Sequence, residues 1–142
     1  MKKNQAVLAA AAVALVVRNF VAPFEQILIG ARIPAGTPRL IAGTGLEGAI
    51  AMALAVRWIK AIAENMKPVD VTAAALGFGL FTTVPWILGY LFAWSPMSSW
   101  WVVLAYVEAL AVYTAVGALA GNLVLRAGRD RTPRRGRPVR AD

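Results

Sequence analysis

Long apolar blocks, separated by short connections, constrain this chain more than any other feature of its sequence. Four blocks lie at about residues 5–22, 40–59, 71–94 and 100–125. Because about 20 helical residues cross the hydrocarbon core of a bilayer, each block is long enough to span it. Charged residues make up only 15% of the 142 residues, against about 25% in an ordinary soluble domain. The sequence therefore predicts an all-α integral membrane bundle of four transmembrane helices.

The first block has a second interpretation. Lys2, Lys3 and the Ala/Val run after them also fit the start of a cleaved signal peptide. The apolar run is long and no convincing small-x-small cleavage site precedes Arg18 and Asn19, so we expect this block to be retained as a span.

Basic residues are distributed unevenly between the two predicted sides. The segments that share a side with the N-terminus contain Lys2, Lys3, Arg57, Lys60, Lys67 and the arginines of the C-terminal tail. The other side has Arg32 and Arg39. Since Lys and Arg favour the cytoplasmic side, we expect both termini in the cytoplasm and the helices in the plasma (inner) membrane.

Residues 126–142 form a Pro- and Arg-rich tail with little to bury, which predicts disorder. We expect its arginines to contact anionic lipid headgroups; they are Arg126, Arg129, Arg131, Arg134, Arg135, Arg137 and Arg140. The motif PRRGRP at 133–138 resembles an AT-hook, which lies in narrow DNA minor grooves. An Arg-rich tail produces such a match by chance, so we do not expect nucleic-acid binding.

The connection at residues 23–38 is too apolar for a free loop and too short to span. Phe24, Ile27 and Leu28 have helical spacing, and Glu25 lies off their stripe. This pattern predicts a short helix in the outer membrane interface. A re-entrant segment is the alternative, if protein or water covers its backbone.

Aromatic residues mark the other outer turn. Trp94, Trp100 and Trp101 flank it and are predicted to lie at headgroup level. Trp86, Tyr90 and Trp94 recur every four residues and share one helix face. We interpret this stripe as a lipid-facing or packing surface, with an aromatic-lined substrate path as the alternative.

Three charged residues inside the blocks are predicted to meet. Glu47 and Glu108 each lie about eight residues, or about 12 Å, below the outer boundary. Arg18 reaches the same depth from the end of the first block. Because intramembrane charges face the bundle interior and find partners, we expect Arg18 to pair with Glu47, with Glu108 nearby. Two carboxylates around one guanidinium leave a negative charge over, which is typical of a proton- or cation-binding site.

Two other interpretations of Glu47 stay open. A buried polar cluster can serve only to fix helix register, and a different helix boundary would let Glu47 reach water. Gly43 and Gly48 flank Glu47, while Gly117 and Gly121 form a small-xxx-small pair. These glycines predict close helix–helix contacts, within one chain or between copies.

Cysteine and histidine are both absent. Their absence removes thiol chemistry, disulfides, His bases and the usual zinc and haem sites. No other catalytic set is visible, so we expect no enzyme, no metal and no cofactor.

Three functions are consistent with the sequence. The first is a non-catalytic subunit of a homo- or hetero-oligomeric membrane assembly, held by the Arg/Glu cluster. The second is a small proton- or cation-coupled transporter or channel that uses Glu47 and Glu108. Four helices are few to enclose a pathway, so this role requires an oligomer. The third is a phage holin, suggested by small size, several spans and a basic tail.

Overall fold

The computed structural model describes residues 2–30, 32–33, 37–62, 65–92 and 100–130. These residues form four α-helices and no strand: α1 (Lys3–Gly30), α2 (Thr37–Lys60), α3 (Pro68–Phe92) and α4 (Trp100–Asp130). All four helices are long and apolar enough to cross a membrane. The predicted all-α class and the four helices are confirmed, and they indicate an integral membrane protein.

The first connection differs from the prediction. Helix α1 continues through Pro23 to Gly30, so the predicted interfacial helix is not a separate element. Its residues are the last two turns of α1. Proline usually ends or kinks a helix in water, but in a bilayer a broken helix exposes backbone groups that no water can satisfy. The Arg39 side chain of α2 caps the end of this longer helix, donating to the carbonyl oxygens of Gly30 and Ile33 at 3.0 and 2.9 Å.

Helix α4 is also longer than predicted. It continues to Asp130, so residues 126–130 are helical and do not belong to a tail. Arg129 donates to the carbonyl oxygen of Met66 at 3.0 Å, which joins the end of α4 to the start of α3. The rest of the predicted tail, 131–142, lies outside the described residues, as does Trp94. Trp100 and Trp101 begin α4.

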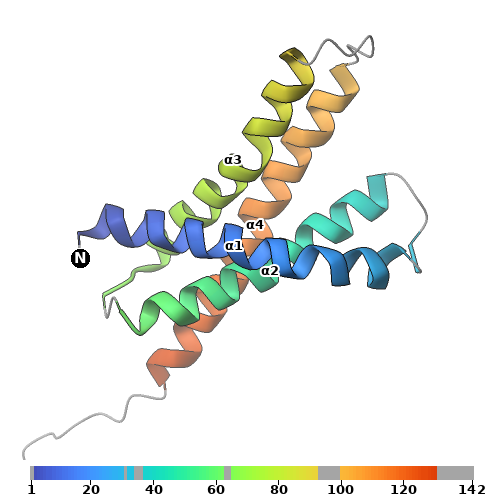
Figure 1. Ribbon diagram of the computed structural model, residues 1–142. Coiled ribbons are helices and arrows are strands. Elements are labelled where there is room, and N and C mark those ends of the chain that lie inside the picture. The colour runs from blue at the N-terminus through green and yellow to red at the C-terminus, as the bar shows by residue number, and fades with distance from the viewer. Residues whose placement is uncertain (1, 31, 34–36, 63–64, 93–99, 131–142) are drawn as a thin grey trace, which may run out of the picture.

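The helices form two antiparallel pairs that cross each other (Figure 1). Helix α1 runs alongside α2, and α3 runs alongside α4. The most extensive contact is between α2 and α4, where the two pairs cross. Away from the crossing, the Phe92 end of the second pair and the Gly30 end of the first point in different directions.

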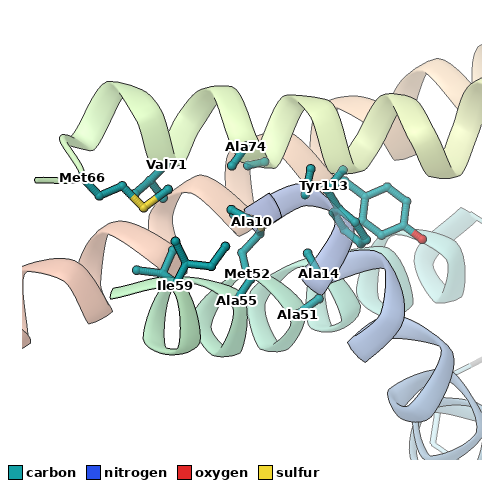
Figure 2. Close-up of a cluster of buried hydrophobic side chains, with 14 of the residues drawn as sticks. Ala10, Ala14, Ala51, Met52, Ala55, Ile59, Met66, Val71, Ala74 and Tyr113 are labelled. Carbon is teal, nitrogen blue, oxygen red and sulfur yellow. The ribbon is translucent and has the colours of Figure 1, made fainter. Parts of the chain in front are cut away.

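Small residues build the core at the crossing (Figure 2). Its buried alanines include Ala10, Ala14, Ala51, Ala55 and Ala74. A methyl group on Gly117 would lie 3.3 Å from the carbonyl oxygen of Gly48, and one on Gly121 would lie 2.6 Å from Cγ1 of Val71. These glycines therefore let α4 approach α2 and α3 closely, which is how membrane helices gain packing energy.

Candidate functional site

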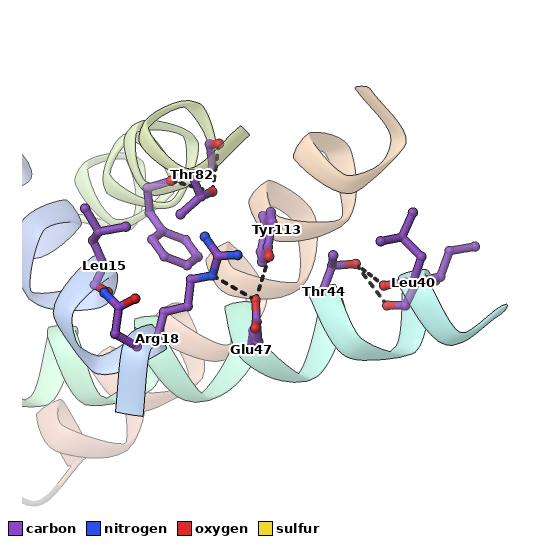
Figure 3. A network of polar contacts seen from close by, with 11 residues as sticks. Leu15, Arg18, Leu40, Thr44, Glu47, Thr82 and Tyr113 are labelled. Carbon is purple, nitrogen blue, oxygen red and sulfur yellow. Dashed lines mark hydrogen bonds and ion pairs between the residues drawn. The ribbon is translucent and has the colours of Figure 1, made fainter. Parts of the chain in front are cut away.

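Arg18, Glu47 and Tyr113 join three helices at the crossing (Figure 3). The Arg18 Nε atom of α1 donates to Oε2 of Glu47 on α2 at 3.1 Å. The Tyr113 hydroxyl of α4 donates to the same oxygen at 2.6 Å. The guanidinium carbon of Arg18 also lies 5.7 Å from the centre of the Tyr113 ring. The structure thus brings Arg18 and Glu47 together as predicted and adds Tyr113.

Glycine positions Tyr113 against Glu47. A methyl group on Gly48 would lie 3.3 Å from both the Tyr113 ring and its carbonyl oxygen. Helix α3 supports the same ring, because Phe78 packs edge-on against Tyr113 with 5.3 Å between ring centres. Glu47 is only 6% exposed as a result. A buried carboxylate is costly without partners, and Arg18 and Tyr113 supply them.

Glu108 does not belong to this cluster, contrary to the prediction. Its side chain is exposed on α4. The buried face of that helix contains Ala109, Tyr113 and Gly117, which are spaced four residues apart. Because successive helical residues are about 100° apart, Glu108 points away from this face. Its predicted depth gave the layer of the membrane but not the direction of the side chain.

Glu25 is the second carboxyl group of the site, and the sequence analysis missed it. It is only 9% exposed, and it lines the same pocket as Glu47. Its carboxyl oxygen lies against Gly43 of α2, where a methyl group would overlap it. The sequence feature that pointed to Glu25 was its spacing from Arg18. Glu25 follows Arg18 by about two helical turns, so the two share a face once α1 continues through Pro23.

A pocket of about 320 Å³ opens beside the two glutamates. Its lining includes Arg18, Glu25, Gln26, Thr44 and Glu47. Arg39 also lines it, but the guanidinium of Arg39 donates to the backbone at the end of α1. Arg18, which is paired with Glu47, is therefore the pocket cation in direct contact with a carboxylate.

A second pocket, of about 220 Å³, also borders Arg18 and is lined from α3 by Thr82, Thr83 and Trp86. The Thr82 and Thr83 hydroxyls donate to carbonyl oxygens of their own helix at 2.6–2.9 Å. Trp86 is the member of the predicted aromatic stripe that reaches this site. The side chain of Tyr90 and all of Trp94 lie outside the description.

Across the described segments, no group of three or more His, Cys, Asp or Glu residues could hold a metal ion. The Arg18, Glu47 and Tyr113 side chains form hydrogen bonds and an ion pair, and the two carboxyl groups that line one pocket can bind or release a proton or cation.

Comparison of the chain with protein-family models, curated proteins and solved structures found no match. The features of the chain that bear on function are therefore those of the site itself, the Arg18, Glu25, Glu47 and Tyr113 side chains.

Proposed function

We propose that this protein is a small proton- or cation-coupled membrane transport protein, in which Glu25 and Glu47 form the coupling site. The observation that supports the proposal is the second carboxyl group, Glu25, which is buried and lines the same pocket as the first. An ion pair that only fastens helices needs one carboxylate for one guanidinium. Here the Arg18–Glu47 pair is complete without Glu25.

The carboxyl pair requires a bound positive species. Two carboxylates beside the single guanidinium of Arg18 leave one negative charge over, which a bound proton would neutralise. A cation between the two groups would balance the charge equally well. Burying an uncompensated charge costs several kcal/mol, which makes the folded site favourable only with one of these species bound.

The hydrogen bonds suggest how binding could be coupled to helix movement. Oε2 of Glu47 accepts from both Arg18 and Tyr113. A proton placed on that oxygen would weaken both bonds, and with them the link between α1, α2 and α4. Release of the proton would restore both hydrogen bonds and the link between the helices. The open pocket beside Glu25 provides access for the proton or cation.

An oligomer, in the plasma (inner) membrane with cytoplasmic termini, is part of the proposal. The most apolar stretches of α1 and α4 are only 22% and 17% buried within the chain, which leaves a large surface for lipid or other subunits. The orientation is supported by basic residues, because Arg57, Lys60 and Arg126 gather where α2 and α4 end.

The second candidate is a non-catalytic subunit of a membrane assembly. It is favoured by the Arg18–Glu47–Tyr113 link, which fastens three helices whether or not anything is transported. A phage holin stays an untested prediction, since no contact in the site bears on it.

Proton flux in reconstituted vesicles distinguishes the two candidates. The protein is placed in liposomes that contain a pH-sensitive dye, and a potassium diffusion potential drives protons inward. The variants are Glu25→Gln and Glu47→Gln, with Glu108→Gln as the matched control on the exposed face of α4. We expect flux in the wild type and in Glu108→Gln, and a loss of at least tenfold in the other two.

The opposite results are equally informative. A wild type without flux of protons, or of sodium and potassium in parallel vesicles, would contradict the transport proposal. If Glu47→Gln then also lost stability while Glu25→Gln did not, the cluster would be a structural link. Circular dichroism of each variant in detergent checks that the helices are retained.

A further inference from the structure

A separate basic pocket lies where α2 and α4 end, away from the carboxyl pair. It has a volume of about 240 Å³ and is lined by Arg57, Lys60, Val124, Ala127 and Gly128. Arg57 and Lys60 are three residues apart on α2, so both reach the same side of the helix. The α4 wall consists of small or apolar residues, which leaves the space between the helices open.

Gly128 determines where the Lys60 side chain lies. A methyl group on Gly128 would overlap the Lys60 ammonium nitrogen, and it would lie 2.9 Å from Cε and 3.4 Å from Cδ. The Lys60 stem thus lies across α4 at a position without a side chain. This contact brings the ammonium group to the wall of the pocket, half-buried and beside Arg57.

Neither cation of the pocket is neutralised by the part of the chain that the structure describes. The ion pair found in that part is Arg18–Glu47, and no described hydrogen bond involves Arg57 or Lys60. Two neighbouring cations repel each other, and a half-buried ammonium group gains much from an anion. The pocket therefore has the charge and the space of an anion site.

Apolar surface next to the pocket identifies the kind of anion. Trp58 is 62% exposed and Ile62 is 71% exposed at the same end of α2. Tryptophan favours the headgroup level of a bilayer, and basic pockets between transmembrane helices at this level bind the headgroups of anionic lipids. We propose that the Arg57/Lys60 pocket binds the phosphate group of an anionic membrane lipid, whose acyl chains lie along the apolar surface of α2.

The test is lipid binding to the purified full-length protein in neutral detergent. Native mass spectrometry would count bound phosphatidylglycerol, with phosphatidylcholine as the neutral lipid. The variants are Lys60→Gln, which removes a charge, and Gly128→Ala, which keeps every charge but displaces Lys60. Lys67→Gln is the matched control, because Lys67 is an exposed lysine that does not line the pocket.

We expect phosphatidylglycerol to bind in preference to phosphatidylcholine. Lys60→Gln should weaken its binding about fivefold, the ratio that corresponds to about 1 kcal/mol for one basic residue. Gly128→Ala should produce a similar loss, and Lys67→Gln should produce none. Circular dichroism checks folding, and Lys60→Gln serves alone if Gly128→Ala does not fold.

Three results would overturn the proposal. An equal loss in Lys67→Gln would show that the binding reflects general surface charge. Equal binding of the two lipids would show that the pocket does not select a headgroup with a net negative charge. Competition by millimolar inorganic phosphate, with the same dependence on Lys60, would assign the pocket to a free anion.

Discussion

The contact between Gly48 and Tyr113 yields a prediction whose magnitude follows from the structure. In Gly48→Ala, the added methyl group would meet the Tyr113 ring and carbonyl oxygen at 3.3 Å and its Cα atom at 3.4 Å. Two of these atoms belong to the backbone, so α4 must move by a few tenths of an ångström. Such overpacking costs about 1–3 kcal/mol, and the better helix propensity of alanine returns up to about 1 kcal/mol.

Gly45 provides the matched control on the same helix. A methyl group there would lie 3.6 Å from Val112 and 3.9 Å from Val116, which is ordinary contact. Gly45→Ala should therefore keep or slightly raise the free energy of unfolding. We expect Gly48→Ala to be about 1–3 kcal/mol less stable than Gly45→Ala, because the gain in helix propensity is the same in both variants and cancels. The displaced Tyr113 hydroxyl adds to this difference, because it donates to Glu47.

The assay is reversible unfolding in mixed micelles, with dodecyl sulfate as the denaturant and tryptophan fluorescence and circular dichroism as the signals. Each variant is measured at several protein concentrations, so that any change in association is seen separately. A Gly48→Ala variant as stable as Gly45→Ala would refute the reasoning. It would mean that α2 and α4 do not approach at Gly48 as closely as described.

Two further predictions concern the site itself. Tyr113→Phe keeps the ring and removes the hydroxyl donor, so it should lower the free energy of unfolding by about 1–2 kcal/mol. In the double variant with Glu47→Gln, the total loss of stability should be smaller than the sum of the two single losses. Additive losses in the same unfolding assay would argue against a hydrogen bond between the two side chains. Gly43→Ala retains every charge, but its methyl group would overlap the Glu25 carboxyl group. Proton flux in vesicles should therefore fall in Gly43→Ala, while Gly45→Ala should keep the wild-type flux. Normal flux in Gly43→Ala would show that the position of Glu25 is unimportant.

The sequence was sufficient to predict the four helices and the Arg18–Glu47 contact. Block length predicts a span because the bilayer has a fixed thickness. Depth predicts the contact because a charge at that level has few other partners. Both inferences use distance along the helix axis, which the sequence provides directly.

The direction of a side chain around the helix was harder to predict. In water, a polar outer face reveals which residues point inward. Here the exposed residues are apolar too, for example Leu119 and Leu123 on α4, so hydrophobicity does not separate the two faces. One feature of the sequence did indicate the buried face of α4. Gly117 and Gly121 are four residues apart, and the same spacing extends to Tyr113. Following that spacing would have placed Glu108 outside the cluster.

The missed Glu25 has a different cause. The predicted first span ends at about residue 22, so Glu25 falls in the connection at residues 23–38. In the structure the helix continues, and Ile29 is buried one turn beyond Glu25 on the same face. The apolar spacing of the segment already indicated a helix. What the sequence did not reveal was its continuity with the span before it.

The two candidate functions differ in whether they account for the burial of Glu25. The Arg18–Glu47–Tyr113 link would be complete if α1 ended at Pro23, because Arg18, the residue that α1 contributes to it, precedes Pro23. The continued helix and the bare backbone at Gly43 both serve Glu25. A structural link uses neither of them, and without a bound proton or cation Glu25 only adds repulsion to Glu47. A site that binds such a species uses both, which is why the flux of Glu25→Gln is the most discriminating measurement.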